Sequence, residues 1–177
     1  MLVGLRESWN RVRTRWWGRW AVDLAVVVLI LAAVAAWQTR RLPKAGTAAP
    51  ELALRTLSGE QVRLSELRGK PVVLTFWAPW CGVCKVESSN VSALRRTAGD
   101  SAHVVSVAVA YEDEEDVRRF MREQGVDYPV YLGGPESMRA FQVDQFPTTF
   151  FLSSEGRVER AVVGYTTRLG LLWRLWL

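Results

Sequence analysis

The only two cysteines of the chain lie close together and are its best candidates for chemistry. Cys81 and Cys84 form a Cys-Gly-Val-Cys motif within 177 residues. Two thiols at this spacing can open and close a disulfide by exchange with another protein. Cys81 is expected at the start of a helix, where unpaired backbone N–H groups favour its thiolate. Cys81 is therefore the predicted nucleophile. Cys84, one turn further and more buried, is predicted to resolve the mixed disulfide.

The same two thiols could instead bind a metal ion. Zinc needs two further ligands, and the only histidine, His103, falls in a predicted buried strand, so no metal site is predicted. Cu(I) accepts two soft thiolates, and a copper-stress chaperone that holds Cu(I) or client proteins through Cys81 and Cys84 stays open as an alternative. No cofactor is expected beyond the redox-active disulfide itself.

The cysteine motif lies between a predicted buried strand and a predicted helix. Residues 71–77 (PVVLTFW) form a continuous apolar run, typical of a strand covered on both faces. Residues 81–98 have the spacing of a helix. Further strands are expected over residues 103–110 and 128–132, hairpins over 51–64 and 148–163, and helices over 117–124, 135–141 and 167–177. Strands that alternate with helices and end in a hairpin predict an α/β sandwich with a mixed central sheet.

The positive charge of the sequence is concentrated near its N-terminus. The formal net charge is +5, and residues 1–19 carry five arginines and one glutamate. Residues 45–177 hold 15 Lys and Arg against 16 Asp and Glu, so this part is almost neutral. A nearly neutral body does not neutralise a row of phosphates, and nucleic-acid binding is therefore not expected.

An uncharged apolar run follows the basic segment. Residues 24–37 carry no charged or polar side chain, and tryptophans near both ends match the interfacial preference of indole. We predict a single-pass anchor in the cytoplasmic membrane over residues 20–38. The excess of arginine before the run places residues 1–19 in the cytoplasm. Residues 39–47 then form a polar tether, and residues 48–177 form a domain in the periplasm or its extracytoplasmic equivalent.

Two segments admit a second interpretation. Residues 33–35 (AVA) could serve as the cleavage site of a signal peptide, although the length of the apolar run and its aromatic flanks favour an uncleaved anchor. Residues 167–177, with Trp173 and Trp176, are interpreted as a helix that covers one face of the sheet. Contact of this helix with the membrane is the alternative.

Two further segments together resemble a known family. Residues 69–87 (GKPVVLTFWAPWCGVCKVE) and 146–158 (FPTTFFLSSEGRV) resemble the membrane-anchored extracytoplasmic thioredoxin-like proteins of the TlpA, ResA and DsbE (CcmG) group, and within it the ScsD-like proteins. The resemblance spans about residues 48–177. It implies a thioredoxin-like fold and thiol-disulfide oxidoreductase activity. It also implies a cis peptide bond before Pro147, which shapes the groove for an extended client segment; a trans proline at a strand start is the alternative.

A carboxylate near the cysteines is a candidate for proton transfer. Glu87 matches a glutamate of this group and lies on the same helix face as Cys84, so it is predicted to take the proton of that thiol. A solvated surface glutamate is the alternative. Thr75 stands where thioredoxins keep a buried aspartate, which removes that proton acceptor.

The residues beside the cysteines are expected to tune the site and to contact clients. The N–H of Val83 is predicted to donate to the Cys81 thiolate and to make the couple more oxidising. Trp77 is expected in the core. Client contacts are expected from Trp80, Gly82, Val83 and Phe146.

These observations predict a membrane-anchored protein disulfide oxidoreductase outside the cytoplasm. The resemblance implies a reductase that forms transient mixed disulfides with specific clients, as in cytochrome c maturation or copper tolerance. Its electrons would come from a membrane reductant of the DsbD or CcdA type. An oxidase or isomerase on the same fold, favoured by the Val83 argument, is the alternative within this class.

Overall fold

The computed structural model describes residues 3–176, and it describes side chains from Trp20 onward. Residues 1, 2 and 177 lie outside this description, as do the arginine side chains of the predicted basic segment 1–19. The chain divides between Arg40 and Arg41 into two units.

The first unit contains one helix, α1 (Val3–Thr39). Its segment Trp20–Thr39 is apolar, and 20 residues at 1.5 Å each span about 30 Å, the thickness of a hydrocarbon core. The apolar side chains of this segment are exposed, among them those of Leu24, Leu29 and Leu31. By length and composition the segment suits a membrane span, and a signal sequence passes the same test.

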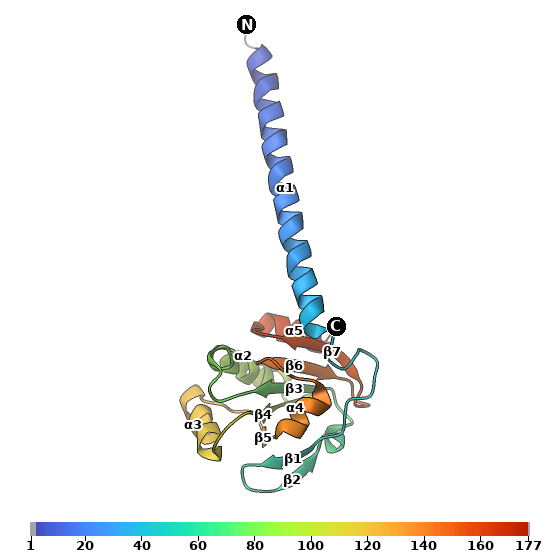
Figure 1. Cartoon of the computed structure of the whole chain (residues 1–177), viewed down its shortest axis with the longest axis vertical. Helices are drawn as coiled ribbons and strands as arrows, with labels where there is room; N and C mark the ends of the chain where they lie inside the picture. Colours follow the sequence, from blue (N-terminus) through green and yellow to red (C-terminus); the bar gives the residue numbers. More distant parts are fainter. Residues whose placement is uncertain (1–2, 177) are drawn as a thin grey trace. The chain divides into compact units, whose positions relative to one another are not determined.

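The second unit is built on a seven-stranded mixed sheet with strand order β2-β1-β5-β4-β3-β6-β7 (Figure 1). Strands β3, β4 and β5 are parallel, and the other pairings are antiparallel. All six residues of β3 are buried, as its uninterrupted apolar run predicts. The strands are β1 (Ala53–Thr56), β2 (Gln61–Arg63), β3 (Val72–Trp77), β4 (His103–Ala108), β5 (Val130–Leu132), β6 (Thr148–Leu152) and β7 (Val158–Val163).

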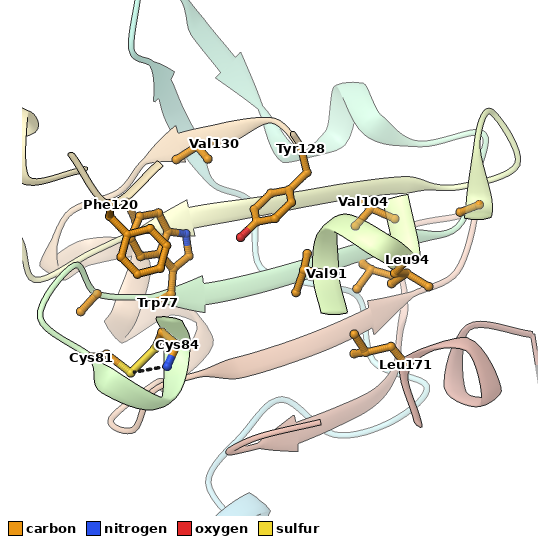
Figure 2. Packing of buried hydrophobic residues seen from close by; sticks show 14 of the residues in the cluster. Trp77, Cys81, Cys84, Val91, Leu94, Val104, Phe120, Tyr128, Val130 and Leu171 are labelled. Carbon is orange, nitrogen blue, oxygen red and sulfur yellow. Dashed lines mark hydrogen bonds between the residues drawn. A yellow bond between two sulfur atoms is a disulfide. The ribbon is translucent and has the colours of Figure 1, made fainter. Parts of the chain in front are cut away.

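Helices cover both faces of the sheet. They are α2 (Gly82–Ala98), α3 (Glu114–Gln124), α4 (Pro135–Phe141) and α5 (Arg168–Trp176), with a short 3-10 turn η1 (Leu64–Leu67). Residues of α2, α3 and α5 share one core cluster with Val73 and Trp77 of β3 (Figure 2). The alternate residues of β3 face a second cluster with α4 and η1. There the rings of Phe76, Phe141 and Phe150 lie 4.8 to 5.8 Å apart between centroids.

The predicted α/β elements occur, with shifts at their ends. Helix α3 begins at Glu114, before the predicted start at residue 117, because Asp113 caps it and accepts a hydrogen bond from the N–H of Glu115 at 3.0 Å. Strand β4 ends at Ala108, before the predicted end at residue 110. The chain turns there, and Ala110 has a φ of +51°.

Residues 41–47, which fall in the predicted tether, are part of the second unit. Leu42 belongs to the core, although the surrounding Pro and Gly residues indicated a free linker. The N–H of Gly46 donates to the C=O of Val158 at 2.7 Å, and Ala48 forms a β-bridge with Arg157. Only three residue steps therefore separate Thr39, the last residue of α1, from the first core residue.

Candidate active site

Cys81 caps the N-terminus of α2, and Cys84 follows one turn into the helix. A tight turn after β3, closed by the bond from the N–H of Cys81 to the C=O of Ala78 at 3.1 Å, leads the chain into the helix. The two cysteines form a disulfide with Cα atoms 5.2 Å apart. The N–H of Cys84 donates to the Sγ of Cys81 at 3.1 Å (Figure 2). The first turn of the helix thus directs an N–H that has no partner within the helix at the sulfur of the predicted nucleophile.

The N–H that reaches the Cys81 sulfur belongs to Cys84 and not to Val83. An N-cap side chain accepts from either the second or the third residue of the helix, which here are Val83 and Cys84. This bond belongs to the disulfide form, so donation from the Val83 N–H to the Cys81 thiolate stays a prediction. The spacing of the motif does not determine which of these two amides turns toward the cap.

Exposed apolar side chains lie next to the nearly buried cysteines in the sequence. Cys81 and Cys84 are 6% and 3% exposed, so the predicted difference in their burial is small. The side chains of Trp80, Val83 and Val86, which we call the apolar collar, are exposed, and Gly82 is exposed between them. Exposed apolar groups around a reactive group commonly mark a surface for a protein partner.

Trp80 is 68% exposed, yet two contacts hold its ring in place. Its Nε1 donates to the C=O of Ala110 at 2.8 Å, and its ring meets that of Phe146 edge-on at 5.8 Å between centroids. The Phe146–Pro147 peptide bond is cis, the geometry that the resemblance implied. Within residues 3–176, neither the N–H nor the C=O of Phe146 has a hydrogen-bond partner. Trp80 and Phe146 therefore form one aromatic surface beside Cys81, next to free backbone groups.

Glu87 is buried on the inner face of α2. Its side chain is 1% exposed, which excludes the alternative of a solvated surface glutamate. Its Oε1 accepts a hydrogen bond from the N–H of Thr166 at 2.7 Å, whereas Oε2 has no partner among the described residues. Burial raises the pKa of Glu87 to about 7, and the bond from Thr166 opposes this rise. A carboxyl group with this pKa can accept or release a proton near neutral pH.

The part of the chain that holds these residues matches a known protein family. The model of the AhpC/TSA family matches residues 45–161. The chain belongs to this family. It is 35% identical over 124 residues to the thiol-disulfide oxidoreductase ResA of Bacillus subtilis (strain 168), covering 69% of each chain. It is 33% identical over 125 residues to the thioredoxin-like protein YneN of the same organism, covering 70% of this chain and 74% of YneN.

A solved structure supports the same assignment. A DsbE-type thiol:disulfide interchange protein from Chlorobium tepidum is similar with a TM-score of 0.69 and 26% identity, over 75% of this chain and 96% of that one. This AhpC/TSA chain is thus a thiol-disulfide oxidoreductase of the ResA and DsbE type, with a thioredoxin-like fold. Cys81 and Cys84 are the only thiols in its sequence for that activity.

In this AhpC/TSA oxidoreductase, Glu87 and Cys84 line the same small cavity, together with Pro147 and Tyr128. Its volume of about 10 Å³ is near the lower limit for one water molecule. Burial raises the pKa of Tyr128 to about 12, so the phenol stays neutral at pH 7. Thr75 also lines the cavity, and its hydroxyl lies 3.0 Å from that of Thr149. Glu87 is therefore the one carboxyl group among the residues that line this cavity.

The described residues do not bring a metal-binding cluster together in this family member. His103 pairs with Val72 at the start of β3, whereas the cysteines follow the end of that strand. Within residues 20–176, no group of three or more His, Cys, Asp or Glu side chains is placed to hold a metal ion.

Three features of the site could not be predicted from the sequence. The C=O of Ala110 bonds to Trp80 and the N–H of Thr166 bonds to Glu87, and Tyr128 lines the cavity that Cys84 and Glu87 share. The first two act through backbone atoms, so their residue types give no signal. Trp77 does follow its prediction, because it is buried, donates to the Ser106 hydroxyl at 3.0 Å and stacks on a core phenylalanine.

Proposed function

We propose that this oxidoreductase is a membrane-anchored reductase of protein disulfides that works outside the cytoplasm. The observation that carries the proposal is the buried Glu87 beside Cys84. A carboxylate in the same cavity disfavours the Cys84 thiolate. Because destabilising a thiolate relative to the disulfide lowers the reduction potential, this arrangement favours a reducing couple.

The reaction transfers two electrons from the cysteine pair to a client disulfide. The Cys81 thiolate attacks one client sulfur, the client S–S bond breaks, and the other client sulfur leaves as a thiolate. The Cys84 thiol loses its proton to Glu87 and attacks Cys81, which releases the second client thiolate and closes the Cys81–Cys84 disulfide. A dithiol of a membrane reductant of the DsbD or CcdA type then reduces this disulfide and is itself oxidised.

The surface around the disulfide suits a protein client. The apolar collar offers contact area, and the free N–H and C=O of Phe146 can pair with an extended client segment beside Pro147. A small-molecule substrate would not require this exposed apolar surface, since such sites are usually enclosed.

The reduction potential tests the direction of electron flow. Equilibration of the protein with a glutathione series should give a value well below about −200 mV, in the range of thioredoxin-type reductants. A value near about −120 mV, typical of a strong oxidase, would contradict the proposed reductase. The Cys81→Ser variant, which cannot form the internal disulfide, serves as the blank.

Membrane topology tests the anchor and the compartment. The five arginines within residues 1–19 precede the Trp20–Thr39 segment, so the N-terminus is expected in the cytoplasm. Alkaline phosphatase, which needs an oxidising compartment, should be active when fused after Leu177 and inactive when fused before Met1. The reverse pattern would contradict the proposed orientation. A mature protein that lacks residues 1–35 would contradict the anchor.

A further inference from the structure

Helix α5 has one face in the core and an opposite face that is apolar and exposed. Leu171 and Leu175 are buried, which confirms the predicted role of this helix as a cover for the sheet. Leu169, Trp173 and Trp176 are 78%, 67% and 52% exposed. At 100° per residue these three side chains fall within an arc of about 60°, on the side opposite the buried leucines. We call these three residues the α5 stripe.

The surroundings of the α5 stripe are cationic. After Glu159 the sequence contains three arginines and no Asp or Glu. Within residues 20–176 every ion pair lies elsewhere, so Arg160, Arg168 and Arg174 have no carboxylate partner. Their guanidinium groups donate to neutral oxygens instead, as in the bond from Arg160 to the C=O of Arg174 at 3.0 Å. Exposed indoles flanked by unpaired arginines are the side chains that interfacial helices present to anionic lipid.

Residues 46–48 and helix α5 are both bonded to the edge strand β7. Residues 46–48 are bonded to Arg157 and Val158, at the start of the edge strand β7. Arg160 of the same strand is bonded to α5. The three residue steps from Thr39 to Leu42 span at most about 11 Å. A domain on so short a connection stays next to the surface that holds its anchor.

We propose that the α5 stripe docks the catalytic domain on the surface of the bilayer, with the indoles at the headgroup level and the arginines against anionic lipid. This inference rests on the proposed membrane anchor. Two other occupants of the stripe, a second copy of the chain and a protein partner, are distinguished by the experiment below.

The test uses the full chain, labelled with 5-fluorotryptophan, in nanodiscs that hold one chain each. The lipid is phosphatidylcholine with about 30 mol% phosphatidylglycerol, and a small amount of lipid is spin-labelled near the headgroup. Paramagnetic broadening of each fluorine resonance is measured, with assignment by single Trp→Phe variants. Trp80 is a matched control, because it is 68% exposed and Trp173 is 67% exposed.

The Trp173 and Trp176 resonances are expected to broaden several-fold more than that of Trp80. The difference should shrink in the Arg168→Gln/Arg174→Gln variant and in discs without phosphatidylglycerol. Equal broadening of Trp173 and Trp80 would overturn the docking proposal, since it reports only random encounters with lipid. In detergent, the Trp173 resonance could shift with protein concentration while showing no broadening in discs. That result would assign the stripe to a second copy of the chain and would overturn the docking proposal. A shift of the Trp173 resonance that appears only after a cell extract is added, without paramagnetic broadening, would assign the stripe to a protein partner and would overturn the docking proposal.

The result separates this inference from the anchor on which it depends. Trp37 lies in the proposed span, so its resonance must broaden if the anchor is in the bilayer. Loss of broadening at Trp37 contradicts the anchor. Broadening at Trp37 without broadening at Trp173 contradicts only the docking of α5.

Discussion

The Cys84→Ser variant is expected to become covalently attached to its clients. Cys81 keeps its place as the cap of α2, and the backbone N–H of residue 84 can still donate to its sulfur. Attack on a client disulfide therefore proceeds, but no second thiol remains to release the client. Adducts should become the main form of the protein, and turnover should stop after the first attack on a client, because the step that releases the client is lost.

Non-reducing gel electrophoresis of an extracytoplasmic fraction measures these adducts, and mass spectrometry names the clients. The Cys81→Ser variant is the matched control and should trap almost nothing, because the thiol that meets the client is gone. Equal trapping by both variants would contradict the division of roles between the two sulfurs. A Cu(I) chaperone would behave differently, since either substitution would weaken copper binding and neither would produce adducts.

The Glu87→Gln variant is expected to remove a pH dependence of both activity and stability. The folded-state pKa of Glu87 is raised to about 7 from a reference value of 4.5. A raised pKa means that the folded state favours the protonated form, so this contribution to stability is complete below pH 4.5 and is lost as pH rises from there through about 7. Full ionisation should cost about 3 kcal/mol, the free energy that corresponds to a pKa change of this size. The amide of the variant stays neutral and can still accept the bond from Thr166.

Urea unfolding of the oxidised protein between pH 5 and pH 9 measures this effect. The wild-type free energy of unfolding should fall over that range, whereas that of Glu87→Gln should stay nearly flat. Release of the mixed disulfide at pH 7 should slow by about 10²-fold, the usual contribution of a positioned proton acceptor. Glu66→Gln, which removes an exposed carboxylate, should match the wild type in both measurements. If Glu87→Gln keeps the wild-type pH profile, Glu87 has no part in proton transfer.

The elements of this fold are predictable because their signals are local. The apolar run of β3 and the turn residues of both hairpins each lie within a few positions of one another. The residues of the cysteine motif are also close together in the sequence, so the placement of Cys81 at a helix start could be predicted. The burial of Leu42 did not, because a single apolar residue among Pro and Gly gives no periodic pattern.

The parts of the site that sequence reasoning missed are contacts between distant backbone atoms. Glu87 and Thr166 are 79 positions apart, and Trp80 and Ala110 are 30 apart. Thr166 and Ala110 contribute only their backbone peptide groups to these pairs. Every residue type except proline has both a backbone N–H and a backbone C=O. Only the register of the sheet and the packing of α2 and α5 determine which peptide group meets which side chain.

The short connection between Thr39 and Leu42 has a consequence for how the enzyme finds its partners. If the proposed anchor is in the bilayer, a catalytic domain held so close to it searches a thin layer rather than the whole compartment. In the proposed arrangement, a reductant embedded in the same bilayer would meet it by diffusion in two dimensions. A freely dissolved client has no such advantage. Under the proposed anchoring, re-reduction would be kinetically favoured over client capture and would hold the enzyme in its dithiol state between encounters.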